Sequence, residues 1–197
     1  DGFTISGGRA NGASLSSRGG GLTSAGSLNR FTLRNLRVKN NEATMGGGFY
    51  VANASPTLSN MIFSSNTAVT SGGGILHTGG GTLKVENSRF DGNQASYGGG
   101  LYLVQGSYEI TQTDFFANSA TQRGGAMYIG SFQPTSAMLT SVHFNGNTSG
   151  NWGGGLYSVG SSPVLTNVAF VDNTAVSVGG GMGNYNNSSP ILTQVSF

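Results

Sequence analysis

The 197-residue sequence contains no cysteine, and it has few prolines and few charged residues. The lack of cysteine excludes disulfide bonds and thiolate metal sites. Charged residues make up 8% of the chain, against about 25% in a typical soluble domain. The formal net charge is only +2, which argues against a nucleic-acid-binding surface. No apolar run is long enough to span a membrane, and no signal peptide is visible.

Glycine is abundant, with 35 residues, and much of it occurs in regularly spaced triplets. A triplet, with alanine as its third residue in one case, follows each of six asparagines by five or six residues. Each of these asparagines follows an apolar residue by three positions. The asparagines of this motif are Asn41, Asn66, Asn93, Asn118, Asn147 and Asn173, spaced by 25, 27, 25, 29 and 26 residues. A repeat of this period, built from short alternating stretches rather than helical ones, indicates a β-solenoid.

The repeat predicts an all-β fold, a right-handed single-stranded parallel β-helix of about seven coils of roughly 26 residues. One coil cannot bury its apolar face alone, so the coils stack into one core, and residues 1–197 form a single domain. The six asparagines are predicted to form one ladder of side-chain hydrogen bonds along the rod.

Phe-x-x-Asn followed by Gly-Gly-(Gly/Ala) and a large apolar residue, as in Phe115-x-x-Asn118 and Gly124-Gly125-Ala126-Met127, carries a family resemblance. It resembles the repeats of the polymorphic outer membrane proteins, which are bacterial surface autotransporter adhesins. It is also similar to parallel β-helix repeat proteins more widely, among them pectate-lyase-like enzymes. The resemblance covers nearly the whole chain, and it implies the fold more specifically than the function.

Acidic residues do not gather on neighbouring coils, so neither a glycosidase carboxylate pair nor a calcium site is expected. The best polar column lies one position before the phenylalanine anchors and contains Arg89, Asp114 and His143 on consecutive coils. These residues are weak candidates for an acid–base cluster. The alternative interpretation, which we favour, is an exposed row of ion pairs with little energetic weight.

A second column lies two positions after the glycine triplets and contains Tyr50, Tyr102, Tyr128 and Tyr157. Because the preceding residue is expected to point inward, these tyrosines are expected to face outward as a stripe. Trp152 precedes a triplet and is expected to extend the same surface. The stripe is a candidate for stacking on sugar rings or for packing against another protein, although tyrosine stacking within the sheet is the simpler interpretation.

The sequence favours a non-enzymatic scaffold or adhesive module that is secreted or displayed at the cell surface, in bacteria, without cofactor or metal. Its expected partners are other protein subunits or surface glycans, with no nucleic acid and no membrane span. The alternative is a polysaccharide-binding or polysaccharide-degrading protein. An ice-binding face is disfavoured because the column after the asparagines is mixed. Neither end carries a polar cap, so we expect the chain to be a segment of a longer polypeptide or to dock on other subunits.

Overall fold

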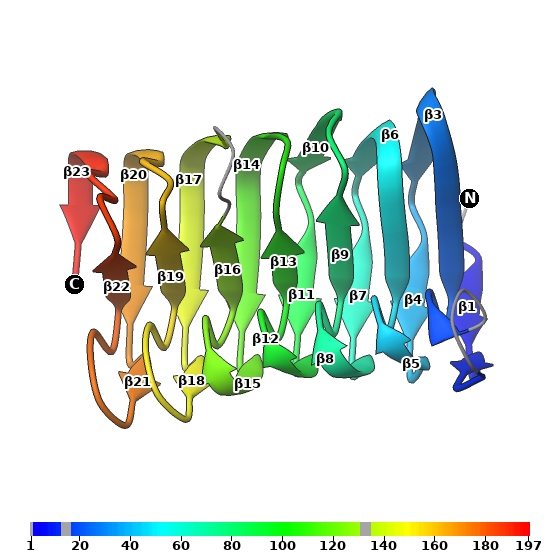
Figure 1. Ribbon diagram of the computed structural model, residues 1–197, viewed down its shortest axis with the longest axis horizontal. Helices are drawn as coiled ribbons and strands as arrows, with labels where there is room; N and C mark the ends of the chain where they lie inside the picture. The colour runs from blue at the N-terminus through cyan, green and yellow to red at the C-terminus, as the bar shows by residue number, and fades with distance from the viewer. Residues whose placement is uncertain (1, 13–16, 131–134) are drawn as a thin grey trace.

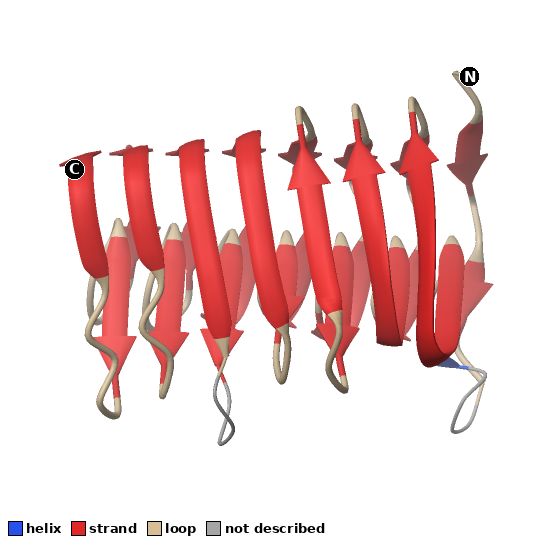
Figure 2. Ribbon diagram, turned by 90° about the horizontal axis from the view of Figure 1, so that it is seen from above, coloured by secondary structure: helices blue, strands red, loops and turns tan. Residues whose placement is uncertain are grey.

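The computed structural model describes residues 2–12, 17–130 and 135–197. Its coils stack into a rod (Figure 1), and seen from above the equivalent strands of successive coils lie side by side (Figure 2). The pairings are parallel: Arg89 lies beside Asp114, and Asp114 lies beside His143. The structure therefore confirms the predicted stacking of coils and the predicted register.

Each coil has three legs, and the first is a row of short strands. It contains β9 (Ile75–Thr78), β13 (Leu101–Leu103), β16 (Met127–Gly130), β19 (Leu156–Val159) and β22 (Met182–Tyr185). The first residues of the long strands β3 (Leu22–Arg34) and β6 (Phe49–Ser59) continue this row, since Phe49 pairs with both Leu22 and Ile75.

The second leg contains the remainder of β3 and β6 and the longest later strands. These are β10 (Thr82–Glu86), β14 (Ser107–Phe116), β17 (Ser136–Asn145), β20 (Val164–Val171) and β23 (Ile191–Ser196). In the earlier coils the end of this leg is a separate short strand: β1 (Thr4–Ser6), β4 (Arg37–Lys39), β7 (Ile62–Ser64) and β11 (Arg89–Asp91).

The third leg is a separate seven-stranded sheet. Its strands are β2 (Arg9–Ala10), β5 (Glu42–Met45), β8 (Thr67–Ser71), β12 (Gln94–Tyr97), β15 (Ser119–Arg123), β18 (Thr148–Ser149) and β21 (Thr174–Ala175). Seven stacked strands delimit about six full turns of the solenoid.

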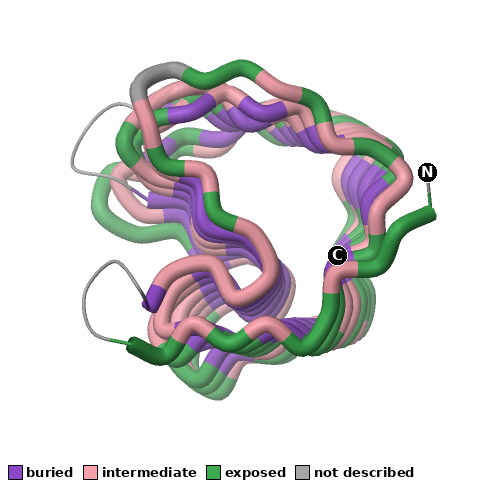
Figure 3. The backbone as a smooth tube through the Cα atoms, turned by 90° about the vertical axis from the view of Figure 1, so that its right-hand side faces the viewer, coloured by how far each residue is buried: buried purple, intermediate pink, exposed green. Residues whose placement is uncertain are grey.

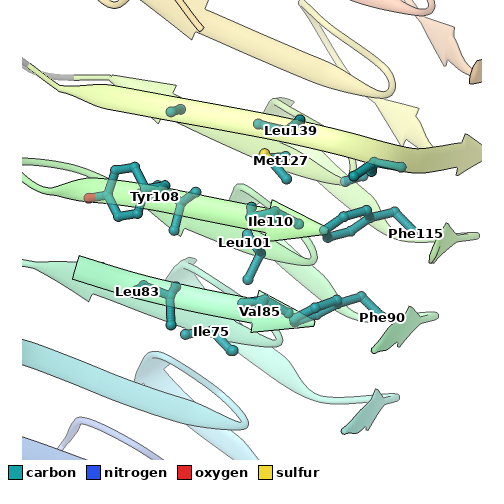
Figure 4. Packing of buried hydrophobic residues seen from close by; sticks show 14 of the residues in the cluster. Ile75, Leu83, Val85, Phe90, Leu101, Tyr108, Ile110, Phe115, Met127 and Leu139 are labelled. Atoms are coloured by element: carbon teal, nitrogen blue, oxygen red, sulfur yellow. The ribbon is translucent and has the colours of Figure 1, made fainter. Parts of the chain in front are cut away.

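The core is a set of columns in which similar side chains stack from coil to coil. The rings of Phe90 and Phe115 are stacked at a centroid distance of 4.9 Å, and those of Phe115 and Phe144 at 5.0 Å. Figure 4 shows Phe90 and Phe115 at equivalent places on neighbouring strands, with Val85 and Ile110 beside them. All five of these side chains are fully buried, so the anchors predicted from the sequence form the continuous core.

The six asparagines form the predicted ladder. In each step the side-chain nitrogen of one asparagine donates to the side-chain oxygen of the next, at 2.8 to 3.0 Å. The steps join Asn41, Asn66, Asn93, Asn118, Asn147 and Asn173. Each side-chain nitrogen also donates to a backbone carbonyl of the preceding coil, as Asn118 does to Phe90 at 3.0 Å. The ladder thus satisfies polar groups inside a narrow corner of the coil.

The glycine triplets lie in the turns that connect third-leg strands to first-leg strands. Gly72 has a φ of +66°, which L side chains rarely adopt. At Gly73 an added Cβ would lie 2.4 Å from the carbonyl oxygens of both Gln94 and Gly99. Close approach of neighbouring backbones, rather than flexibility, therefore requires the glycine at the centre of the triplet.

A bend within the second leg was not predicted from the sequence. Each coil has one residue here in the left-handed region, with φ between 46° and 57°: Asn35, Asn60, Asn87, Gln112, Ser141, Asn167 and Gln194. Asparagine tolerates this conformation better than most residues. After the bend, the inward-pointing and outward-pointing positions along the strand are exchanged. The phenylalanine anchors therefore point into the core.

Candidate binding groove

The tyrosine column lies on the outer side of the first leg. Tyr102 pairs with Tyr128, and Tyr128 pairs with Tyr157. The residues that flank Tyr128 in sequence, Met127 and Ile129, are fully buried in the core. Because side chains alternate along a strand, the tyrosines point away from that core, as predicted.

The expectation of an open stripe is wrong for two of the four tyrosines. Tyr50 is only 4% exposed, and Tyr157 is fully buried. The third-leg residues that precede the glycine triplets fold over them. The guanidinium of Arg18 lies 5.1 Å from the ring centre of Tyr50, and that of Arg123 lies 5.5 Å from the ring centre of Tyr157. Viewed along the rod, the backbone outline bends inward on one side (Figure 3).

Tyr102 and Tyr128 remain partly exposed and line a groove of about 460 Å³. Their rings are stacked, with centroids 4.7 Å apart and planes 19° from parallel. Tyr97 meets the edge of Tyr128 at 6.0 Å. Burial raises the pKa of both Tyr102 and Tyr128 above the ordinary value of 10.0. Both phenols are therefore neutral donors and acceptors at physiological pH.

One of the residues that line the groove is a glycine. In the column that also contains Val104, Val159 and Tyr185, the position on β16 is Gly130. A Cβ at Gly130 would lie 2.6 Å from a Val159 methyl and 2.8 Å from the Tyr128 ring. The exposed ring of Tyr185 closes one end of the groove.

Arg123 places a positive charge at the groove. Its guanidinium lies 4.6 Å from the ring centre of Trp152, and Trp152 in turn packs on Tyr185 at 5.2 Å. Trp152 therefore joins the tyrosine surface, as predicted. The Nε of Arg123 is buried without a hydrogen-bond partner, and no carboxylate pairs with this arginine among the residues that the structure describes.

The column of Arg89, Asp114 and His143 lies on the second leg, where the register predicted it. His143 Nδ1 is 2.9 Å from Asp114 Oδ1, and both side chains are more than half exposed. Arg89 does not join them, because it turns to Asp91 at 3.0 Å. The sequence therefore placed the three residues correctly, but the structure brings together only two of them.

A buried polar pair, His77 and Tyr108, lies within the core. His77 Nε2 donates to the carbonyl of Ala54 at 3.0 Å, and its ring meets Tyr108 edge-on at 5.4 Å. His77 Nδ1 and the Tyr108 hydroxyl have no hydrogen-bond partner among the described residues. Burial lowers the pKa of His77 below its ordinary value of 6.5, although the bond to Ala54 opposes this shift. The burial of His77 and the lowered pKa favour the neutral imidazole and a structural role in the core.

Within residues 2–12, 17–130 and 135–197, no group of three or more His, Cys, Asp or Glu side chains is arranged to hold a metal ion. In the same ranges, no helix is long and apolar enough to cross a membrane.

Reasoning from the sequence missed Arg123, Tyr97, Gly130 and Tyr185. Arg123 and Tyr97 occupy the same place as Trp152, immediately before a glycine triplet. A comparison of all residues that immediately precede a triplet would have identified Arg123 and Tyr97. Gly130 and Tyr185 interrupt a column of small and aliphatic residues, which is a weaker signal.

Comparison with known proteins agrees with this architecture. Searches of curated proteins and of solved structures gave no match. The family model described as "right handed beta helix region" matches residues 1–197, which is the whole chain. This match confirms the β-helix repeat fold, and the resemblance to polymorphic outer membrane protein repeats stays a prediction. The chain belongs to the right-handed β-helix family.

Proposed function

We propose that this chain is a non-enzymatic binding scaffold, secreted or displayed on a bacterial cell surface, which presents its groove-bearing first leg to a partner. The observation that carries the proposal is the continuity of the ladders. The asparagine ladder joins coil to coil by direct side-chain bonds from Asn41 to Asn173. Such continuity gives a stiff rod whose outer columns repeat at about 4.8 Å.

The outer surface supports recognition better than catalysis. The charged pairs there, such as Lys84 with Glu109 and Arg89 with Asp91, are solvent-exposed and contribute under about 1 kcal/mol each. By contrast, the groove collects aromatic faces, neutral hydroxyls and one cation. A concave site with a few oriented polar groups is the usual form of a ligand site. Surface glycans and other protein subunits are the partners that such a face suits.

One observation favours an alternative, a polysaccharide-cleaving enzyme. The hydrogen bond between Asp114 and His143 resembles a carboxylate-oriented general base. No third polar side chain from a neighbouring coil completes the site in the described part of the chain, because the next residue in the column is Ala169. We therefore place this pair second.

Incubation with neutral and acidic polysaccharides, followed by measurement of polymer molar mass, separates the two functions. A scaffold leaves the molar mass unchanged, and beads coated with the protein are retained on a polysaccharide or cell surface. The alternative function requires a fall in molar mass that Asp114→Asn and His143→Gln abolish.

A further inference from the structure

We infer that the groove formed by Tyr102, Tyr128, Arg123 and Tyr185 binds an acidic glycan. A pyranose ring of this glycan stacks on the tyrosines, and its carboxylate pairs with Arg123. The inference rests on the proposed binding function and names its ligand class.

The aromatic side of the groove fits a sugar ring. Tyr102 and Tyr128 are stacked at 4.7 Å and remain partly exposed, so together they present an apolar surface with hydroxyl groups at its margin. Tyr185 is 55% exposed and adds a ring at the end of the groove. Pyranose rings have apolar faces of C–H groups, and aromatic rings combine such an apolar contact with a polar tip.

Gly130 lies among the residues that line the groove. Valine occupies the equivalent position in the coils on either side, at Val104 and Val159. A Cβ at Gly130 would lie 2.6 Å from a Val159 methyl and 2.8 Å from the Tyr128 ring, so these side chains already occupy the space that a larger residue would need. Glycine therefore allows Tyr128 and Val159 to pack closely against the β16 backbone, where both line the groove.

The charge in the groove identifies the ligand as acidic. Arg123 is half-buried, and its guanidinium packs on Trp152 and Tyr157 at 4.6 and 5.5 Å. These rings hold the planar group in one orientation. No acidic residue lines the groove, and none pairs with Arg123 in the described ranges. A partly desolvated cation without a counter-charge attracts an anion, and a carboxylate matches the guanidinium fork.

Other polar groups complete the site for an oligosaccharide. Gln105 and Asn186 lie at the groove and are exposed, and their side-chain amides supply donors and acceptors for sugar hydroxyls. The groove runs across consecutive coils, from Tyr102 on β13 to Tyr185 on β22. Its length therefore suits several linked sugars rather than a monosaccharide.

The test is calorimetric titration of the full chain with two probes that differ only at C6, cellotetraose and the β-1,4-linked tetramer of glucuronic acid. The uronate tetramer is expected to bind at least about tenfold more tightly, because a charge-assisted bond distinguishes the two. Arg123→Gln should remove this difference, and Arg123→Lys should reduce it. Gly130→Val should weaken binding of both ligands, because the added side chain displaces the Tyr128 ring and Val159, which line the groove.

The control is Arg89→Gln, which removes a charge of the same kind from the second leg and should leave both affinities unchanged. Thermal unfolding of each variant verifies folding, and Arg123→Lys replaces Arg123→Gln if the latter unfolds. Equal affinity for the two tetramers, no binding of either, or unchanged binding in the Arg123 variants would overturn the inference. The molar-mass measurement tests the scaffold function separately, since it does not depend on which ligand the groove prefers.

Discussion

Asn118 accepts two hydrogen bonds from Asn93 at a single side-chain oxygen, one from the backbone nitrogen and one from the side-chain nitrogen, both at 3.0 Å. Its own nitrogens donate onward to Asn147 and to the carbonyl of Phe90. One buried amide therefore joins three consecutive coils. Removal of any rung leaves polar groups of two neighbouring coils unpaired.

Asn118→Ala is expected to lower the free energy of unfolding by about 3 kcal/mol or more, since several buried groups lose their partners. Denaturant unfolding monitored by circular dichroism measures the change. Asn167→Gly is the control: Asn167 is exposed, has a φ of +54° and makes one bond to Ser141. Loss of the Asn167 side chain should lower the free energy of unfolding by less than about 1 kcal/mol. Equal effects of the two substitutions would contradict a structural role for the ladder.

Gly73→Ala is expected to destabilise the fold more than Gly146→Ala. The added methyl group at Gly73 meets two carbonyl oxygens at 2.4 Å, which forces the coils apart at a cost of about 3 kcal/mol or more. At Gly146 nothing lies within 4 Å, so only the positive φ of +64° opposes alanine, at roughly 1–2 kcal/mol. The melting temperatures of the Gly73→Ala and Gly146→Ala variants measure the difference in stability. The reverse order would contradict close packing of neighbouring backbones as the reason for glycine at position 73.

The coil repeat could be predicted from the sequence because its signals recur at fixed offsets. Phe90 and Asn93, or Phe115 and Asn118, define the same two columns in each coil. The burial of Tyr50 and Tyr157 could not be predicted in this way. The side chains of Arg18 and Arg123, which lie over these rings, come from another leg of the coil, so the contacts are not encoded in the local pattern of the tyrosine strand.

The bend in the second leg illustrates a different limit. The residues at the bend, such as Asn60 and Gln112, adopt a left-handed conformation that was not predicted from the sequence. Glutamine and serine share this column with asparagine, and they are weaker indicators of that conformation. The groove was missed for a similar reason, since Gly130 is informative only once Val104 and Val159 are known to be its neighbours.

Stability is expected to depend on pH through His77. Because burial lowers its pKa in the folded state, the unfolded chain binds a proton more readily. The folded state therefore gains its full stability from neutral His77 at pH values above the ordinary pKa of 6.5. As the pH falls from 6.5 toward the lowered pKa of the folded state, the free energy of unfolding decreases by at most about 1.4 kcal/mol per pH unit. His77→Leu, which copies Leu103 of the next coil, should flatten this dependence. Denaturant unfolding at several pH values measures this pH dependence. His143→Gln removes an exposed histidine, and this variant should keep the pH dependence of the unaltered chain.

The Asp114–His143 pair is expected to contribute little to stability. Both side chains are exposed, so a double-mutant cycle with Asp114→Asn and His143→Gln should give a coupling energy under about 1 kcal/mol. We expect both the unaltered chain and these variants to leave polysaccharides uncleaved. A much larger coupling, or a cleavage activity that disappears in either variant, would favour the enzymatic alternative.

The central claim is binding without cleavage, and one measurement addresses it directly. The protein is mixed with polyglucuronate and passed over a size-exclusion column with light-scattering detection. We predict that the protein elutes with the polymer and that the molar mass of the polymer alone, measured after the protein is removed, does not change. A decrease in polymer molar mass, or protein and polymer that elute separately, would contradict the account.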